Sequence, residues 1–437
     1  MFILSRQKQC FVYSVFQTIF GVRFLKLFDF CVIFCWVFLT FWALSINMLL
    51  QIKIYLISIL YFLGALYMVL FPPRNFELSG AKIRTTRSTG DNLKFKEYVD
   101  HKGLSFAVDA FHRRDPEVVK VVHLAPQTFE NRSIVAVELR SDKHTRKPGI
   151  LIVGALNPMA WASPNAILEL SEKLLYDASY QTPFFNDYDW YLVPMGNPDG
   201  IEFTHNMRTR RALNSVDWTQ NVSARAETRP TEWHKNVDLE DEQNDKRCFG
   251  TNINRNFAYH WQDDVHKTPT RCCQYYPGQK PFSAAEAKAI RKYVDKMGDF
   301  INLAIHLHAS FVPKKEYILY PWRYSLRTPS NYRTLQDIGE YAARQARLPD
   351  GRLYEVHQSS NDERVAGTLI DYISGVVGID LVFLIKPYHE MFPNFTDTSN
   401  LRLYVKKSIS TVLSLVRAWR SSTKQNTLSF FGRDVEF

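Results

Sequence analysis

Hydrophobic residues follow two different patterns along this 437-residue chain. Near the N-terminus they form two long runs, Phe30–Leu50 and Ile54–Phe71, which only Gln51–Lys53 separates. Each run is close to the roughly 20 apolar residues that span a lipid bilayer. From about residue 87 onward, apolar residues come in short runs or at helical spacing, which is typical of a globular α/β domain. The pattern therefore predicts a membrane-inserted or signal region followed by a folded domain.

The clearest pair of predicted elements lies between residues 149 and 175. Gly149–Ala155 is a short apolar run rich in β-branched residues, as expected for a buried parallel strand. After it, Ser163 is a good N-cap, Pro164 fits the first helical position, and apolar residues recur at helical spacing. The loop Leu156–Ala162 should therefore lie at the carboxyl end of a strand, where open α/β sheets place their active sites.

The same patterns predict the other elements of the domain. Helices are expected over Lys94–His112, directly after Glu286, over Leu335–Arg347 and over Leu401–Trp419. Strands are expected over Glu117–Leu124, Ile134–Leu139, Asp189–Val193, Ile301–His308 and Ile379–Lys386. The residues Asn197–Gly200 are expected to form a turn.

Composition adds limits on the partners of the chain. With 46% hydrophobic and 22% charged residues, the chain can bury one large α/β core. The formal net charge is +10, but lysines and arginines are scattered and form no basic stripe with interleaved aromatic residues. We therefore expect a solvated basic surface and no nucleic-acid partner. Sequons at Asn131, Asn221 and Asn394 agree with a secreted glycoprotein.

Four sequence blocks carry a resemblance to a known family. They are the loop that ends in Trp161, Asn197-Pro-Asp-Gly followed by Thr204-His205, Asn254-Arg-Asn-Phe, and Tyr317-Ile-Leu-Tyr-Pro-Trp. In this order they resemble the zinc metallocarboxypeptidases of the carboxypeptidase A/B type, over residues 87–420. The resemblance implies an α/β fold with a mixed, mostly parallel central sheet flanked by helices. It also implies a disulfide between Cys248 and Cys272, which needs an oxidising compartment.

The chain departs from this family at the positions that bind zinc. The family's loop has the pattern His-x-x-Glu-Trp, whose two ligand positions fall on Asn157 and Ala160. The third ligand position falls on His308, with His306 as the second choice. The family's general base falls on Lys386, and a lysine near its ordinary pKa of about 10.4 cannot take a proton from water at neutral pH. We therefore expect zinc to be absent or weakly bound.

Other positions fit the substrate-binding pattern that the resemblance implies. Arg211 falls on the arginine that stabilises the oxyanion. Asn254 and Arg255 match the pair that binds the substrate's terminal carboxylate, for which a planar guanidinium is well suited. Ile370 falls at the base of the specificity pocket, which suits an apolar C-terminal side chain, and Glu363 falls on the family's mobile tyrosine. The alternative role for Arg255 is a structural ion pair.

Two further hypotheses concern the altered site. In the first, Lys386 replaces the absent metal cation and holds a ligand's carboxylate. In the second, metal binding has been rebuilt, because His306 and His308 are two residues apart on a predicted strand and so share a face. Glu363 or His389 would then complete the ligand set.

The sequence therefore predicts a catalytically inactive, carboxypeptidase-like protein that binds peptide or protein C-termini. One alternative is an active carboxypeptidase with a rebuilt site that removes apolar C-terminal residues. Another is a membrane-attached interaction protein that uses the polar insertion between Arg211 and Cys248.

We divide the chain into a hydrophobic N-terminal region (1–72), a linker (73–86), a folded domain (87–420) and a C-terminal tail (421–437). The domain is expected to be lumenal or extracellular, either anchored to the membrane or secreted. The alternatives of one span, two spans and a cleaved signal stay open, as does a start at Met1 or Met48.

Overall fold

The computed structural model describes residues 95, 97–212, 233–238, 248–263, 270–346, 348, 350–389 and 398–431, without the side chains of 207–212 and 424–431. These residues belong to the second of two units into which the chain divides, Ile83–Phe437. Both apolar runs that predict membrane insertion or a signal lie outside the described residues. Within the described part, no helix combines the length and the apolar character needed to cross a bilayer.

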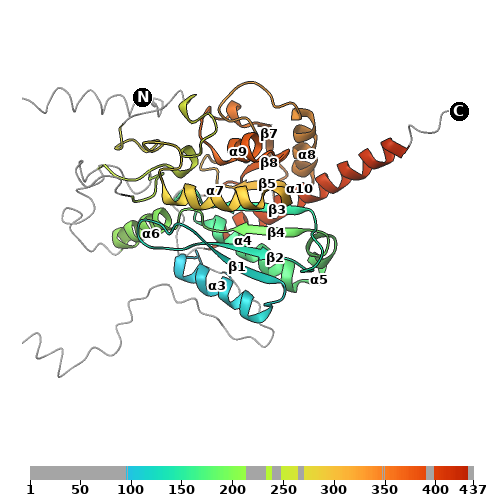
Figure 1. Cartoon of the computed structure of the whole chain (residues 1–437), viewed down its shortest axis with the longest axis horizontal. Helices are drawn as coiled ribbons and strands as arrows, with labels where there is room; N and C mark the ends of the chain where they lie inside the picture. The colour runs from blue at the N-terminus through green and yellow to red at the C-terminus, as the bar shows by residue number, and fades with distance from the viewer. Residues whose placement is uncertain are drawn as a thin grey trace, which may run out of the picture. The chain divides into compact units, whose positions relative to one another are not determined.

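Eight strands form one mixed sheet through the middle of the described domain (Figure 1). They are β1 (Val119–Leu124), β2 (Ile134–Leu139), β3 (Gly149–Gly154), β4 (Asp189–Val193), β5 (Ile301–Leu307), β6 (Tyr317–Tyr320), β7 (Glu355–Gln358) and β8 (Leu381–Lys386). Their spatial order is β1-β2-β4-β3-β5-β8-β6-β7. The central pairs β4–β3, β3–β5 and β5–β8 are parallel, whereas β1–β2, β2–β4 and β8–β6 are antiparallel. The predicted mixed sheet is therefore confirmed.

Helices flank this sheet. The longer ones are α3 (His101–Arg114), α4 (Ala162–Tyr176), α6 (Pro198–Ala212), α7 (Ala285–Met297), α8 (Tyr332–Gln345) and α10 (Ser399–Phe431). Short helical turns are α5 (Ala178–Tyr180), η1 (Gln181–Phe185), η3 (Ile253–Arg255), η4 (Trp261–Asp263), η5 (Gly298–Phe300), η6 (Ser359–Asn361), α9 (Leu369–Tyr372) and η7 (Ile373–Val377). Several predicted bounds differ from these. Helix α3 begins later than Lys94, α8 ends at Gln345, and α10 continues past Trp419. The strands β1 and β8 begin later than Glu117 and Ile379. The expected turn at Asn197–Gly200 is wrong, because Pro198–Gly200 already form the start of α6.

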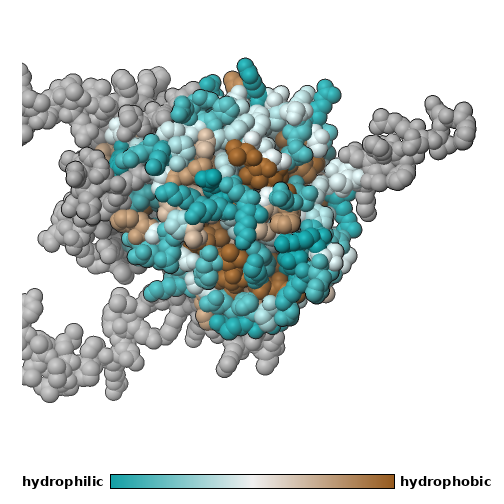
Figure 2. Space-filling view, in the orientation of Figure 1, coloured by the Kyte–Doolittle hydropathy of each residue, from teal (hydrophilic) through white to brown (hydrophobic). Residues whose placement is uncertain are grey.

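Side chains alternate between two hydrophobic cores, one on each face of the sheet. In β3, Ile150 and Ile152 belong to the core that includes residues of α4, α8 and α10. Leu151 and Val153 belong to the other core, which includes residues of α7 and α9. A strand that is buried on both faces has no side that faces solvent, which is why β3 is continuously apolar in sequence. The face of the molecule shown in Figure 2 is covered mainly by polar and charged side chains, with smaller apolar patches.

Two of the sequence blocks fix the loop that follows β3. The indole nitrogen of Trp161 donates to the Thr204 hydroxyl at 2.9 Å, and this hydroxyl donates to the carbonyl of Pro158. The side-chain nitrogen of Asn197 donates to the carbonyl of Leu156 at 3.1 Å. These bonds satisfy buried backbone groups, so the blocks hold the loop in one conformation.

The predicted capping role of Ser163 is wrong. Helix α4 already begins at Ala162, and its N-cap position, Trp161, makes no side-chain capping bond. Ser163 is fully buried, and its hydroxyl lies 2.9 Å from the hydroxyl of Tyr404 in α10. A long-range partner has therefore replaced the local bond that a serine at this position would otherwise make.

Candidate functional site

The carboxyl ends of three neighbouring parallel strands define the candidate site. Gly154 at the end of β3 pairs with Leu307 of β5, and Leu307 pairs with Ile385 of β8. His308 and Lys386 therefore follow at the same level of the sheet, beside the loop after β3. This arrangement confirms that the loop after β3 lies at the carboxyl end of a strand, next to the other two predicted site positions.

Asn157 in this loop is bonded to other protein groups. Its side-chain nitrogen lies 3.0 Å from Nδ1 of His234, and its side-chain oxygen accepts from the backbone N–H of Met159 at 2.9 Å. The ring of His234 stacks on Tyr275, with 5.9 Å between the centroids. Ala160 is buried and offers only a methyl group. His234 was not found from the sequence, because it lies far along the chain, within the polar insertion between Arg211 and Cys248.

The two histidines of the β5 segment lie in an environment that keeps them uncharged. His306 is buried within the strand, and its ring centroid lies 5.7 Å from that of His308. Burial lowers the pKa of His306 well below its ordinary value. Burial and the nearby charge of Lys386 lower the pKa of His308 to about 3. The Ala309 backbone N–H donates to Nδ1 of His308 at 2.7 Å.

Lys386 forms an ion pair with a neighbouring carboxylate. Its Nζ lies 2.6 Å from Oδ2 of Asp362, and the side chains are only 15% and 20% exposed, respectively. Burial lowers the pKa of Lys386, and Asp362 opposes that change. An ammonium that donates to a carboxylate has no lone pair with which to act as a base. The position of the family's general base therefore holds a cation in this structure.

A second carboxylate, Glu363, lies between two arginines. Its Oε1 is 3.0 Å from Nη2 of Arg255, and its Oε2 is 2.8 Å from Nη2 of Arg323. The Arg255 guanidinium also lies over the ring of Tyr275, 4.6 Å from its centroid. Burial raises the pKa of Glu363, but the two arginines and Lys386 outweigh burial and bring this pKa to about 2. The structure therefore shows the ion pair that we considered as the alternative role of Arg255.

Arg323 is held in place by the buried carboxylate of Asp371. The backbone N–H groups of Arg323 and Tyr324 donate to Asp371 at 2.8 and 3.0 Å. The carbonyl of Arg323 accepts from the backbone N–H of Val365 at 3.0 Å. Arg323 was missed from the sequence, although it directly follows the block that ends at Trp322. Its contact with Glu363 joins residues 40 positions apart, and no local pattern marks such a contact.

The remaining predicted residues lie around this cluster or outside the described side chains. Asn254 and Arg255 belong to η3, and the Asn254 side-chain oxygen accepts from the backbone N–H of Leu369 at 3.1 Å. Ile370 in α9 is buried in the core shared with α7. Gly367, with φ +67°, lies so close to the carbonyl of Arg255 that a Cβ would be 2.5 Å from it. Arg211 lies near the end of α6, where side chains are not described.

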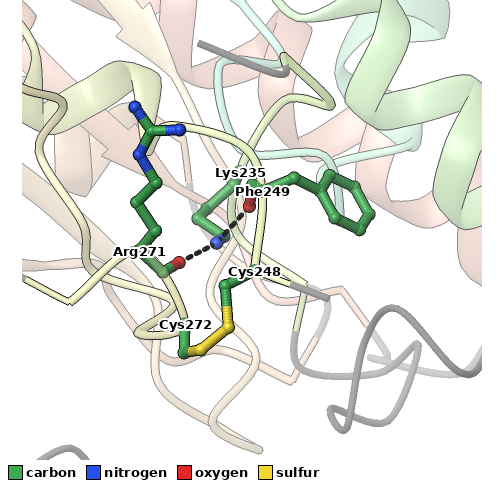
Figure 3. The surroundings of a disulfide bond; sticks show 5 residues. All are labelled: Lys235, Cys248, Phe249, Arg271 and Cys272. Carbon is green, nitrogen blue, oxygen red and sulfur yellow. Dashed lines mark hydrogen bonds between the residues drawn. A yellow bond between two sulfur atoms is a disulfide. The ribbon is translucent and has the colours of Figure 1, made fainter. Parts of the chain in front are cut away.

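The predicted disulfide between Cys248 and Cys272 is confirmed (Figure 3). Beside it, the fully buried ammonium of Lys235 donates to the carbonyls of Phe249 and Arg271, the residues that flank the two cysteines. Burial lowers the pKa of Lys235 to about 7. Lys235 therefore forms hydrogen bonds with both of the segments that the disulfide links.

The side chains at the family's zinc positions do not fit a zinc ion. Zinc sites use imidazole, thiolate and carboxylate donors, and three protein ligands are usual in catalytic sites. Here the three positions supply a carboxamide that is bonded to His234, a methyl group and the single imidazole of His308. Among the described residues, no three His, Cys, Asp or Glu side chains are grouped to hold a metal.

The two residues considered to complete a rebuilt zinc site, Glu363 and His389, are engaged in other contacts. Glu363 is paired with both arginines, and Nε2 of His389 lies 3.0 Å from the hydroxyl of Tyr98. The nearby charge of Lys386 also opposes the binding of a cation.

Comparison with known proteins gives consistent matches. A family model described as zinc carboxypeptidase matches residues 106–400. Zinc carboxypeptidase A 1 of Drosophila melanogaster is 24% identical over 298 residues, which cover 64% of this chain and 58% of the relative. Inactive metallocarboxypeptidase ECM14 of Saccharomyces cerevisiae is 27% identical over 280 residues, which cover 61% of this chain and 57% of the relative. The chain thus spans less than two-thirds of the length of these two relatives.

Solved structures show the same fold. The crystal structure of carboxypeptidase A from Helicoverpa armigera matches with a TM-score of 0.63 and 20% identity, and the match covers 78% of both chains. Bovine thrombin-activatable fibrinolysis inhibitor, in complex with a tick carboxypeptidase inhibitor, matches with a TM-score of 0.61 and 20% identity. This match covers 75% of the present chain and 99% of the bovine one.

Proposed function

The chain belongs to the zinc carboxypeptidase family, and we propose that it binds the C-termini of peptides or proteins without hydrolysing them. The observation that carries this proposal is the pair of arginines, Arg255 and Arg323, that together hold one carboxylate, that of Glu363. Planar guanidinium groups are the preferred protein partners of carboxylates. The same residues can therefore receive the terminal carboxylate of a peptide.

The replaced residues support the absence of hydrolysis. Peptide hydrolysis in this family requires a metal that activates water and a base that accepts its proton. The amide of Asn157 and the methyl group of Ala160 provide no suitable ligands. The ammonium of Lys386 is paired with Asp362 and donates a proton instead of accepting one. A reaction through bound zinc is therefore not part of the proposed function.

Residues around the arginines support selection of an apolar C-terminal residue. Ile370, in the buried α9 turn, falls at the base of the specificity pocket in the family pattern. We propose that Asn254 in η3 assists Arg255 at the terminal carboxylate. We also propose that Arg211 faces the preceding peptide carbonyl. Each of these roles predicts weaker binding when the side chain is removed.

The compartment is part of the same proposal. The disulfide between Cys248 and Cys272 supports a secretory route, because disulfides persist in oxidising compartments. We propose that the domain is lumenal or extracellular and that the hydrophobic N-terminal region attaches it to the membrane.

Metal content and C-terminal cleavage test the absence of hydrolysis. The full-length protein is purified in detergent, its zinc content is measured, and a peptide that ends in phenylalanine is incubated with it and analysed by mass spectrometry. We expect far less than one zinc per chain and an unchanged peptide mass. One zinc per chain together with release of phenylalanine would replace the proposal with an active enzyme.

Binding of the same peptide tests the carboxylate site. We expect the free-acid peptide to bind and its C-terminal amide to bind at least about tenfold more weakly, because the amide loses the charge-assisted bonds to arginine. Arg255→Met should abolish this preference. Arg291→Met is the matched control, because Arg291 is an exposed arginine paired with Asp295 on the surface of α7. Equal binding of acid and amide by the wild type would refute the proposal.

A further inference from the structure

Glu363 holds the two arginines in the way that an external carboxylate would. Each of its oxygens pairs with a different guanidinium, Oε1 with Arg255 at 3.0 Å and Oε2 with Arg323 at 2.8 Å. A carboxylate shared between two arginines receives charge-assisted bonds on both oxygens. The structure therefore contains a carboxylate-binding site whose present occupant is a side chain of the same protein.

The arginines lie beneath this occupant. The side chains of Arg255 and Arg323 are 5% and 9% exposed, whereas that of Glu363 is 44% exposed. Solvent therefore reaches the carboxylate more readily than either guanidinium. An incoming carboxylate can replace Glu363 from the solvent side while both arginines keep their positions.

Backbone hydrogen bonds hold both arginines in place. The backbone N–H of Arg323 donates to Asp371 at 2.8 Å, and its carbonyl accepts from the N–H of Val365 at 3.0 Å. The backbone N–H of Arg255 donates to the carbonyl of Asn252, the N-cap of η3, at 3.0 Å. Neither set of bonds involves the carboxylate of Glu363, so both arginines keep these bonds when that carboxylate leaves.

The charges of the cluster favour exchange of one carboxylate for another. Arg255, Arg323 and Lys386 supply three positive charges, and Asp362 and Glu363 supply two negative charges, so the cluster carries one net positive charge. Displacement of Glu363 alone would remove this carboxylate from two buried guanidinium groups, which is costly. A ligand that brings its own carboxylate keeps the arginines paired. A neutral ligand cannot do this.

We propose that Glu363 is an internal competitor that occupies a clamp formed by Arg255 and Arg323, and that a peptide C-terminus binds by displacing it. This inference rests on the proposed function and adds Arg323 as the second arm of the clamp. The pKa of Glu363, about 2, keeps the competitor ionised throughout the physiological range. The clamp is therefore opened by a competing carboxylate and not by a change of pH near neutrality.

Substitution of Glu363 tests the competition directly. The full-length protein is titrated into an N-terminally fluorescent pentapeptide that ends in phenylalanine, and binding is followed by fluorescence anisotropy. If the clamp is vacant for about one-tenth of the time in the wild type, Glu363→Gln should tighten binding about tenfold. The affinity for the C-terminal amide of the peptide should not change. Arg323→Met in the Glu363→Gln background should remove the gain.

Two further variants make the test specific. Asp362→Asn changes the charge of the cluster by the same amount one residue earlier, but Asp362 pairs with Lys386 and not with the arginines. Asp362→Asn should tighten binding by less than about threefold, because it changes only the electrostatic field around the arginines. Glu363→Asp keeps the charge and shortens the side chain, so it should also tighten binding. This variant decides the question if Glu363→Gln does not fold.

The outcomes separate the two proposals. Binding by the wild type with no gain in Glu363→Gln or Glu363→Asp overturns the competition and leaves the proposed function standing. Equal gains in Asp362→Asn and Glu363→Gln also overturn it, because charge alone then explains the effect. No binding of the free acid by any variant overturns both proposals. Binding that is seen only after substitution of Glu363 supports the competition and overturns binding by the wild-type protein.

Discussion

Removal of the Asp371 carboxylate is predicted to destabilise the fold and to displace Arg323. Asp371 is fully buried and accepts from the backbone N–H groups of Arg323 and Tyr324. Asp371→Ala leaves both donors in a buried environment without this acceptor. Each buried donor that loses its partner costs about 1–3 kcal/mol. We therefore expect the free energy of unfolding to fall by about 2–6 kcal/mol at pH 4.

The size of this loss should depend on pH. Burial raises the pKa of Asp371 from 3.8 to about 6, against the backbone N–H groups that favour its charged form. A raised folded-state pKa means that the folded protein binds the proton more tightly between pH 3.8 and 6 than the unfolded chain does. The contribution is present below pH 3.8 and is lost as the pH rises through 6. A shift of about two units corresponds to about 3 kcal/mol.

Urea unfolding followed by tryptophan fluorescence measures both effects. Asp371→Ala should destabilise the protein more at pH 4 than at pH 7.5, by up to about 3 kcal/mol. Asp380→Ala is the matched control, because Asp380 is exposed, and it should change stability by less than about 0.5 kcal/mol. At either pH, Asp371→Ala should also weaken binding of the free-acid peptide. The account would be refuted if Asp371→Ala were as stable as the wild type at pH 4. It would also be refuted if the variant lost more stability at pH 7.5 than at pH 4.

Three further changes have expected outcomes. Burial raises the pKa of Glu286 from 4.5 to about 8, so its stabilising contribution is lost as the pH rises through 8. The free energy of unfolding of Glu286→Gln, measured with urea relative to the wild type, should therefore rise by up to about 5 kcal/mol between pH 5 and pH 9. Replacing Cys248 and Cys272 by serine opens a link with a sequence separation of 24 and should lower the free energy of unfolding by about 3–4 kcal/mol, measured without reductant. Tyr404→Phe removes the hydroxyl that lies 2.9 Å from that of Ser163, and should cost about 1–2 kcal/mol in thermal unfolding.

The elements that the sequence predicted well are those that satisfy local rules and global packing together. The strand expected over Ile134–Leu139 is β2 with the same bounds, and the strand over Asp189–Val193 is β4. Each is mainly apolar and is buried at every position, because both faces of the sheet are covered. The strands β6 and β7 were missed because they have only four residues each, and Glu-Val-His-Gln in β7 has no apolar pattern.

The sequence also predicts which site positions have lost their family chemistry. This prediction concerns Asn157, Ala160 and Lys386, because motif spacing assigns these positions, and a residue type by itself decides whether it can bind zinc or accept a proton. The disulfide between Cys248 and Cys272 followed from the same resemblance. These conclusions needed only residue identity and order along the chain.

Only the tertiary structure decided how the charges of the site are paired. Glu363 meets Arg255 across 108 positions and Arg323 across 40, and Lys386 meets Asp362 across 24. Such pairs form where loops from different strands converge at one edge of the sheet, so no local period or propensity encodes them. The sequence placed Arg255, Glu363 and Lys386 in the site, but it did not reveal Arg323 or Asp362. The fold determined which of them neutralise one another, because attraction between charges depends on distance in space.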